Sequence, residues 1–384
     1  MGGVLGIEKA INIGIKEGGL IRPFATTKGI VQTMMAFDAM SLEQSRAGKQ
    51  GPMNVPSLRV EFVKEVGGKA LMWALGGAST EAVGIDALNG DINDMIFDVE
   101  DAAQDLAAEL GWTYLQSKPI GIRQADIDRL KNNPTDLMDF VKNKTWQLGE
   151  GFVKKIQNDF LPKTTAVATT GGATGAASAT RLQSLHYGLS TGQQHNGTGT
   201  ATGFEYCGIE MGTANTDLRA IQWSDENSAA VAFNMAGLRN NILRPLNSRG
   251  WYPDLMLGNA VGYTGFQTLI ESDFLFGSVK KLDYGVETIM VEGLYLVYEP
   301  RLDNFLNSSG TAINKLIVGC SESLNIRFAD KSGTGNDILN GTFKVRELER
   351  TVHAGYMQGG ATAAIALKHP FKWGQANSLS FPTS

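Results

Sequence analysis

Cysteine is scarce in this sequence, which has Cys207 and Cys320 and no other among its 384 residues. Two cysteines cannot make the network of disulfides that holds small secreted domains together, and no Cys-x-x-Cys pair is present. Histidine is scarce too. The histidines that occur have no spacing typical of metal ligands: His186, His195, His353 and His369. The sequence therefore predicts a chain made in a reducing compartment, with no metal and no cofactor.

Long hydrophobic runs are missing as well. No apolar stretch approaches the roughly 20 residues needed to cross a bilayer. The amino end reaches Glu8 without a basic start and an apolar core, so it does not have the pattern of a secretory signal. Gly6 stands where a myristoylation motif needs serine or threonine. We therefore expect no contact with a membrane.

Positive charge is not in excess. Lys and Arg number 34 against 39 Asp and Glu, which gives a formal net charge of −5. The pairs Lys154-Lys155 and Lys280-Lys281 are too small to form a surface dedicated to nucleic acid, and they leave room only for weak, non-specific contact with DNA. Hydrophobic residues make up 42% and charged residues 19%. This composition is typical of a globular protein, and the length allows one elaborated domain or two.

Catalytic motifs are almost lacking. Residues 188–192 match the G-x-S-x-G nucleophile elbow, in which the serine lies between a strand and a helix and has an acid and a histidine as partners. The residues after Ser190 are unsuited to a helix. The surrounding tract, 162–203, is rich in Thr, Gly and Ala, and such a pattern arises there by chance. We therefore predict no catalytic residues and no enzyme, with a serine hydrolase that uses Ser190 as an alternative.

The stretch from Trp251 to Asn304 has the clearest structural pattern. A short apolar strand, 255–257, follows Pro253-Asp254 and stops at the turn residues Gly258-Asn259. Next, apolar residues spaced three and four apart predict an amphipathic helix over 263–270. The order strand, turn, helix is therefore the first part of the pattern.

Two runs rich in β-branched and aromatic residues follow, 286–291 and 294–298, on either side of Glu292-Gly293. They predict a hairpin that is covered on both faces. This order of elements resembles that of the tailed-bacteriophage major capsid proteins, the family with the Hong Kong 97 capsid fold. The resemblance extends, in order, over roughly residues 55–370. The residues that carry it are Pro253-Asp254, Asn259, Leu282-Asp283, Gly285 and Gly293.

The resemblance implies an α+β fold with an amino-terminal arm, a projecting β-hairpin loop, a peripheral domain with a long spine helix, and an axial domain. The implied boundaries are 1–54 for the arm, 55–90 for the projecting hairpin, 91–215 for the first part of the peripheral domain, 216–325 for the axial domain, and 326–384 for the return strands and carboxyl tail of the peripheral domain.

The arm and the hairpin cannot bury their apolar residues alone. Apolar and charged residues alternate from residue 58, and Gly67-Gly68 between two such runs predicts a two-residue hairpin turn. An isolated hairpin is only marginally stable, so it must lie on another surface. We expect contacts with neighbouring subunits at Ile7, Ile11, Ile15, Leu58, Arg59, Val60, Glu61, Phe62, Lys64, Glu65, Lys69, Met72 and Trp73.

Three longer helices are predicted. One covers 91–110, with an apolar stripe and acidic residues opposite, and a longer one covers 135–160, behind Asn133-Pro134. The longer helix is the first choice for the spine and 91–110 the second. A third helix covers 227–246, where Pro245 ends or kinks its last turn. Later strands are predicted at 313–318, 323–328, 342–349 and 361–367.

The function that the resemblance implies is structural. Copies of the chain would assemble into pentamers and hexamers that form the icosahedral head shell of a virion around the phage double-stranded DNA. Implied partners are the chain itself, scaffolding and portal proteins, and the packaged DNA, with assembly in the host cytoplasm. Because the sequence starts at Met1 without the charged helical segment of many family members, a separate scaffolding protein is expected. An encapsulin-like nanocompartment shell, which shares the fold, is the other alternative.

Overall fold

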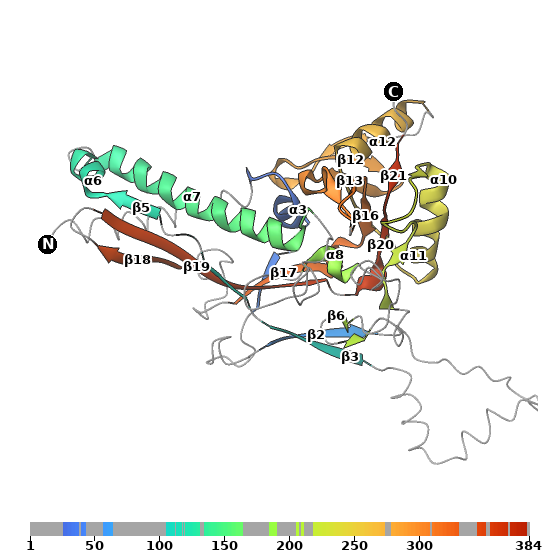
Figure 1. The fold of residues 1–384 in the computed structure, drawn as a ribbon, viewed down its shortest axis with the longest axis horizontal. Helices are drawn as coiled ribbons and strands as arrows, with labels where there is room; N and C mark the ends of the chain where they lie inside the picture. The colour runs from blue at the N-terminus through green and yellow to red at the C-terminus, as the bar shows by residue number, and fades with distance from the viewer. Residues whose placement is uncertain are drawn as a thin grey trace, which may run out of the picture.

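The computed structural model contains two larger sheets, a long helix and several smaller elements (Figure 1). The mixture of helices and strands agrees with the α+β class expected from the sequence. The residues that the structure describes are 26–37, 40–43, 57–63, 105–111, 113–116, 118, 120–130, 134–163, 184–189, 205–206, 209–210, 218–272, 278–307, 309–329, 344–350, 354–367 and 369–381.

The larger sheet has seven strands. In spatial order they are β11 (Ser278–Lys281), β12 (Glu287–Val291), β13 (Leu294–Tyr298), β10 (Leu255–Gly258), β16 (Leu316–Gly319), β20 (Trp373–Ala376) and β8 (Ile221–Gln222). β10 lies in the middle, parallel to β13 and antiparallel to β16. Every residue of β10 is buried. An unbroken apolar run is what a strand covered on both faces requires, and the predicted strand is confirmed.

β12 and β13 form the predicted hairpin. Glu292 and Gly293 are its turn residues, with φ of 53° and 85°. Two successive positive φ angles match a two-residue turn to the right-handed twist of the strands. Val291 pairs with Leu294 directly beside the turn. Both strands bury neighbouring residues, so the prediction that each face is covered is also confirmed.

A single core joins this sheet to the helices on it. The predicted helix over 263–270 is confirmed and is longer, since α12 runs from Ala260 to Ser272. The rings of Phe233, Phe266 and Phe381 meet at the centre of the core, with centroids 4.6 Å (Phe233–Phe266) and 4.9 Å (Phe233–Phe381) apart. Residues from α12, from the helices over 235–248 and from five of the seven strands make up this core.

The helix predicted over 227–246 begins later than expected. Val231 lies in the short strand β9 (Val231–Ala232), and the helix starts at α10 (Met235–Leu238), where the side chain of Asn234 accepts a hydrogen bond from Gly237 N–H at 2.6 Å. A wider π-helical turn, η3 (Arg239–Leu243), follows and leads into α11 (Arg244–Ser248). Pro245 lies in the first turn of α11 and neither ends nor breaks the helix. Proline has no N–H to donate, and the wide turn before it accommodates its ring.

The second sheet is built around β19 (Ala354–Leu367), a strand of 14 residues. Its first half pairs with β18 (Lys344–Arg350) and β5 (Ile120–Arg123). Its second half pairs with β17 (Leu324–Ala329) and β4 (Thr113–Gln116). β1 (Met40–Glu43) adds to β17 at the edge. The predicted strands over 323–328, 342–349 and 361–367 are confirmed, and β19 is longer than predicted.

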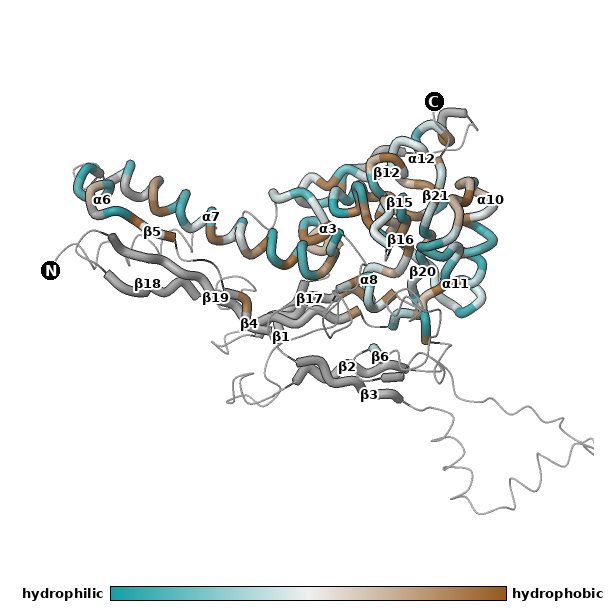
Figure 2. Tube along the Cα trace, in the orientation of Figure 1, coloured by the Kyte–Doolittle hydropathy of each residue, from teal (hydrophilic) through white to brown (hydrophobic). Residues whose placement is uncertain are grey.

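Helix α7 (Pro134–Phe160) lies along this second sheet (Figure 1). It has 27 residues and is the long helix predicted over 135–160. Figure 2 shows hydrophilic and hydrophobic segments alternating along it, as in a helix with one polar and one apolar face. The buried face includes five residues of the predicted stripe: Val141, Leu148, Phe152, Ile156 and Phe160.

One prediction near the amino end is wrong. Residues 105–110 of the predicted helix over 91–110 lie in a strand, β3 (Asp105–Gly111), and 91–104 lie outside the described residues. β3 pairs with β2 (Ser57–Val63), while the hairpin turn predicted at Gly67-Gly68 lies outside the described residues. The apolar residues 106 and 110 suit a helix, but 106, 108 and 110 also alternate as a strand requires. Pairing with the alternating residues of β2 decides between the two.

The carboxyl-terminal stretch is divided between the sheets. β20 lies in the seven-stranded sheet beside β16, while β18 and β19 lie in the other sheet. Trp373 is fully buried, and its ring packs so closely on Gly319 that a Cβ there would lie 2.1 Å from it. The remaining described α-helices and β-strands are α3 (Ile30–Ala36), α6 (Gln124–Leu130), α8 (Leu185–Gly188), β6 (Glu205–Tyr206), β7 (Ile209–Glu210), β14 (Phe305–Leu306), β15 (Ala312–Ile313) and β21 (Leu379–Ser380).

Candidate subunit-contact surfaces

The β2–β3 ribbon contains the predicted contact residues that lie within the described part of the chain. Its register places Leu58 opposite Leu110, Val60 opposite Ala108 and Arg59 opposite Glu109. In the described part of the chain the ribbon pairs with no third strand, and a two-stranded ribbon alone is marginally stable. The contact candidates Leu58, Arg59, Val60, Glu61 and Phe62 lie in β2. The others lie outside the described residues: Ile7, Ile11, Ile15, Lys64, Glu65, Lys69, Met72 and Trp73.

The residues that carry the family resemblance hold the ends of β10 in place. Before the strand, Asp254 accepts hydrogen bonds from Ser321 N–H at 2.7 Å and from Ser321 Oγ–H at 2.5 Å. After it, the Asn259 side chain accepts from Gly262 N–H at 2.8 Å and so caps helix α12, while its amide donates to Asn314 Oδ1 at 2.8 Å. These polar residues fix how the chain enters and leaves the central strand.

A second carboxylate fixes the same end of the sheet. Asp303 accepts from Ala260 N–H at 2.8 Å and from the Tyr298 hydroxyl at 2.5 Å. The hydrogen bond to Asp303, with burial, raises the pKa of Tyr298 to about 12. Gly285, with φ of 76°, allows the tight turn before β12 that the family pattern requires. The matching residues therefore act as turn and cap residues.

A groove of about 480 Å³ opens beside these residues, between α3, α12 and the end of β13. Both apolar and polar residues line it, and no sequence pattern singled it out. Val261 is 49% exposed on α12, and Tyr298, which lines the groove, is 37% exposed. The lining residues are Lys28, Gly29, Gln32, Thr33, Ala260, Tyr263, Thr264, Lys281, Gly285, Val286, Glu287, Val297 and Tyr298.

The most exposed large apolar side chain of the described residues is Tyr252, at 76%. Two contacts hold the backbone in place here. Cys320 Sγ–H donates a hydrogen bond to the Tyr252 carbonyl at 3.4 Å. Next to it, Lys372 Nζ lies 3.6 Å from the centroid of the Trp251 ring. Trp146 on α7 is 45% exposed. An aromatic side chain on a fixed backbone loses little entropy when it is covered, which suits a contact with another molecule. The sequence alone does not distinguish such residues from core aromatics.

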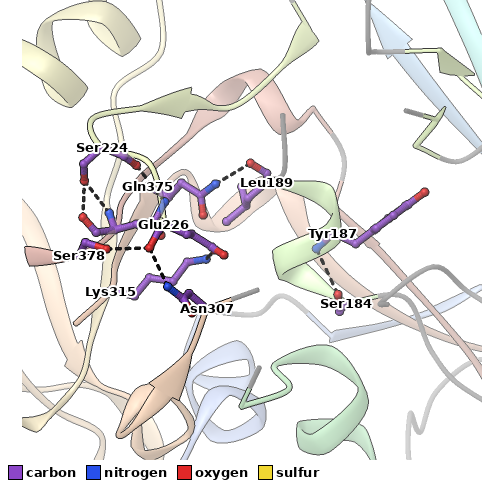
Figure 3. Close-up of polar contacts among 10 residues, drawn as sticks. Ser184, Tyr187, Leu189, Ser224, Glu226, Asn307, Lys315, Gln375 and Ser378 are labelled. Carbon is purple, nitrogen blue, oxygen red and sulfur yellow. Dashed lines mark hydrogen bonds and ion pairs between the residues drawn. The ribbon is translucent and has the colours of Figure 1, made fainter. Parts of the chain in front are cut away.

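A buried polar cluster connects the loops beside the start of β16 and the end of β20 (Figure 3). Lys315 and Glu226 form an ion pair at 2.8 Å with side chains 1% and 0% exposed. Asn307 and Ser378 both donate to the Glu226 carbonyl, at 3.1 and 2.9 Å. Gln375 donates to the Leu189 carbonyl at 2.8 Å and so ties α8 to β20. Burial lowers the pKa of Lys315, while Glu226 opposes this change. The cluster is structural, because its two charged groups pair with each other.

The structure gives the G-x-S-x-G pattern a different setting from a nucleophile elbow. The residues before Ser190 form helix α8, capped by Ser184 Oγ, which accepts from Tyr187 N–H at 3.1 Å. A nucleophile elbow has a strand in this place. Ser190 itself lies outside the described residues. In the described part of the chain no group of three or more His, Cys, Asp or Glu residues could hold a metal ion, and no helix there is long and apolar enough to cross a membrane.

Known proteins resemble this chain in structure. No sequence-family model and no curated protein matches it. The Cyanophage A-1(L) capsid asymmetric unit matches with 17% identity and a TM-score of 0.50, covering 84% of this chain and 86% of that chain. The holo-SrpI encapsulin complex from Synechococcus elongatus matches with 9% identity and a TM-score of 0.46, covering 91% and 90%. A structure from Microbacterium phage Oxtober96 matches with 10% identity and a TM-score of 0.43, covering 92% and 92%.

The likeness to the cyanophage capsid extends over most of both chains, and it defines the class: this chain has the fold of the phage capsid proteins. The resemblance inferred from Pro253-Asp254, Asn259, Leu282-Asp283, Gly285 and Gly293 is thereby confirmed at the level of the fold. The contact candidates of the arm and the hairpin stay predictions.

Proposed function

We propose that this chain is the major capsid protein of a tailed bacteriophage, whose copies form pentamers and hexamers and close into an icosahedral head shell around double-stranded DNA. The observation that carries the proposal is the phage capsid fold, found over 84% of the chain. The fold itself contributes no catalytic step to this function. Assembly is the activity, and it depends on surfaces that one copy cannot cover by itself.

The parts of the fold then take the following roles. The seven-stranded sheet is the axial domain around each capsomer axis, and α7 is the spine helix of the peripheral domain, lying on the sheet of β19. The β2–β3 ribbon is the base of the projecting loop, and it covers a neighbouring subunit together with the part of the arm, 1–54, that precedes α3, since α3 and β1 pack within their own subunit. The net charge of −5 lets the inner face hold packaged DNA through weak, non-specific contacts.

Scaffolding and portal proteins are the further partners of this proposal, with assembly in the host cytoplasm. The size of a shell of many identical chains must be set during assembly, and the shell needs one site of DNA entry. A scaffolding protein would set the size, and a portal protein would form the entry site.

Electron microscopy of the purified chain tests the proposal. Expressed alone and with a candidate scaffolding protein, the chain should form closed shells of uniform size, seen by negative staining and by sedimentation. A compact monomer at high concentration under both conditions would contradict a shell function. Nuclease-protected DNA inside shells made during infection supports the phage head, whereas an enclosed enzyme and no DNA indicates a nanocompartment. Esterase activity that a Ser190→Ala substitution removes would support the hydrolase alternative instead.

A further inference from the structure

One fully buried carboxyl group lies where three separate parts of the chain meet. Glu299 follows strand β13 and is 0% exposed. Its Oε1 accepts from Arg301 N–H at 2.9 Å, and the backbone N–H of Ile30, the first residue of α3, also donates to its carboxyl group. Its own N–H donates to the Gly258 carbonyl at 2.9 Å, at the end of β10. Glu299 therefore connects α3 directly to two strands of the seven-stranded sheet.

The end of helix α7 is held at the same point. Gln157 Nε2 donates to the Lys28 carbonyl at 3.2 Å, just before α3, and Arg301 Nε donates to the Leu161 carbonyl at 3.2 Å, just after α7. The packing of Gly29 against α7 is tight, since a Cβ on Gly29 would lie 2.6 Å from Gln157 Nε2 and 3.5 Å from Glu299 Oε1. Gly29 also has φ of 134°, which side chains rarely tolerate. We call this meeting point of α3, α7 and the end of β13 the Glu299 junction.

The surroundings of Glu299 favour its neutral form. Its Oε2 has no hydrogen-bond partner among the described residues, and an ionised oxygen buried in this way costs free energy. The charged groups that act on it are Arg301, which favours ionisation, and Asp303, which opposes it. α7 contributes the neutral amide of Gln157, and Lys28 on the α3 side is exposed. Burial, the largest cause, raises the pKa of Glu299 to about 7.

We infer that the Glu299 junction is a protonation-dependent latch, which holds α3 and the end of α7 on the seven-stranded sheet when Glu299 is neutral and loosens when Glu299 ionises. The direction follows from proton linkage. Between its ordinary pKa of 4.5 and its raised pKa of about 7, the latched form holds a proton that the open form has lost. Stability of the junction is therefore highest at acidic pH and falls as the pH rises through this range. The inference depends on the fold of one subunit and not on shell assembly.

Hydrogen–deuterium exchange of the full chain at pH 5.5 and pH 8 tests this inference, with rates corrected for the intrinsic effect of pH. The protection of amides in α3 and at residues 156–161 should fall by about tenfold or more at pH 8, while amides of β16 should change little. The Glu299→Gln variant keeps the size and the acceptor oxygen of this side chain but cannot ionise, so its protection should be the same at both pH values.

Glu322→Gln is the matched control, because the Glu322 side chain is 68% exposed and lies away from the junction, paired with Lys372. This variant should keep the pH response of the unmodified chain. Equal protection of α3 at both pH values in the unmodified chain would overturn the inference without any variant. A pH response that persists in Glu299→Gln would overturn it as well, since another group would then carry the effect.

Discussion

Asn259 shows how one polar side chain can hold two elements. Its buried side chain caps helix α12 and also binds Asn314. Asn259→Ala removes both interactions, so we expect the free energy of unfolding to fall by about 1–2 kcal/mol, as measured by urea denaturation. Gln267→Ala, at an exposed position of the same helix, is the control and should change little. Equal losses in the two variants would contradict the capping role.

The buried pair of Lys315 and Glu226 makes a stronger prediction at the scale of the residue. Lys315→Met leaves the Glu226 carboxylate buried without its ammonium partner, so we expect a loss of about 3–5 kcal/mol. A double variant with Glu226→Leu removes both charges and should recover a large part of this loss. Denaturant unfolding of both proteins measures the difference. If the double variant is no more stable than the single one, the unpaired Glu226 carboxylate is not the cause of the stability loss in Lys315→Met.

At the scale of the element, two glycines should respond to alanine in opposite directions. Gly151 lies in α7 at an exposed position, and apart from its two neighbours and the adjacent backbone of its own helix no atom lies within 4 Å of the place that a Cβ would take there. Gly151→Ala should therefore stabilise the chain by about 0.5–1 kcal/mol through helix propensity. Gly293 has φ of 85° in the hairpin turn, so Gly293→Ala should destabilise by about 1 kcal/mol. Thermal unfolding measures the change in stability that each substitution causes. A stability change of the same sign in both variants would contradict the turn geometry.

The elements that the sequence predicts well are those whose local pattern and tertiary setting agree. The hairpin at Glu292-Gly293, the central strand at 255–257 and the helix ending at Phe160 each combine a strong periodic pattern with clear turn or capping residues. Their neighbours in space reinforce what the local sequence already favours. Consistency between the two levels makes such segments predictable.

The elements that the sequence mispredicts are those whose state is decided by distant partners. Leu106 and Leu110 fit a helix equally well, and pairing with β2, more than forty residues earlier, makes them part of a strand. The Glu299 junction could not be predicted either, because its three parts come from positions near 30, 160 and 300. A single carboxylate in a sequence gives no sign that it will be buried. Only the fold brings these groups together.

At the scale of the whole molecule, the predicted contact face of β2 can be tested by assembly. Val60→Lys places a charge in the middle of that strand, so we expect shells to be lost or strongly reduced while the thermal unfolding of the subunit stays nearly unchanged. Sedimentation and electron microscopy measure the shells. Lys154→Gln, at an exposed position of α7, is the control and should assemble normally. Normal shells from Val60→Lys would exclude β2 as a contact.

The position of β20 determines when the seven-stranded sheet can be completed during synthesis of the chain. β20 lies between β16 and β8 inside the seven-stranded sheet, although it is made long after both. During synthesis the ribosome must therefore release residues 373–376 before that sheet can close, and until then β16 has one unpaired edge. A nascent chain therefore keeps this sheet incomplete until residues 373–376 have emerged, however early its other strands have formed.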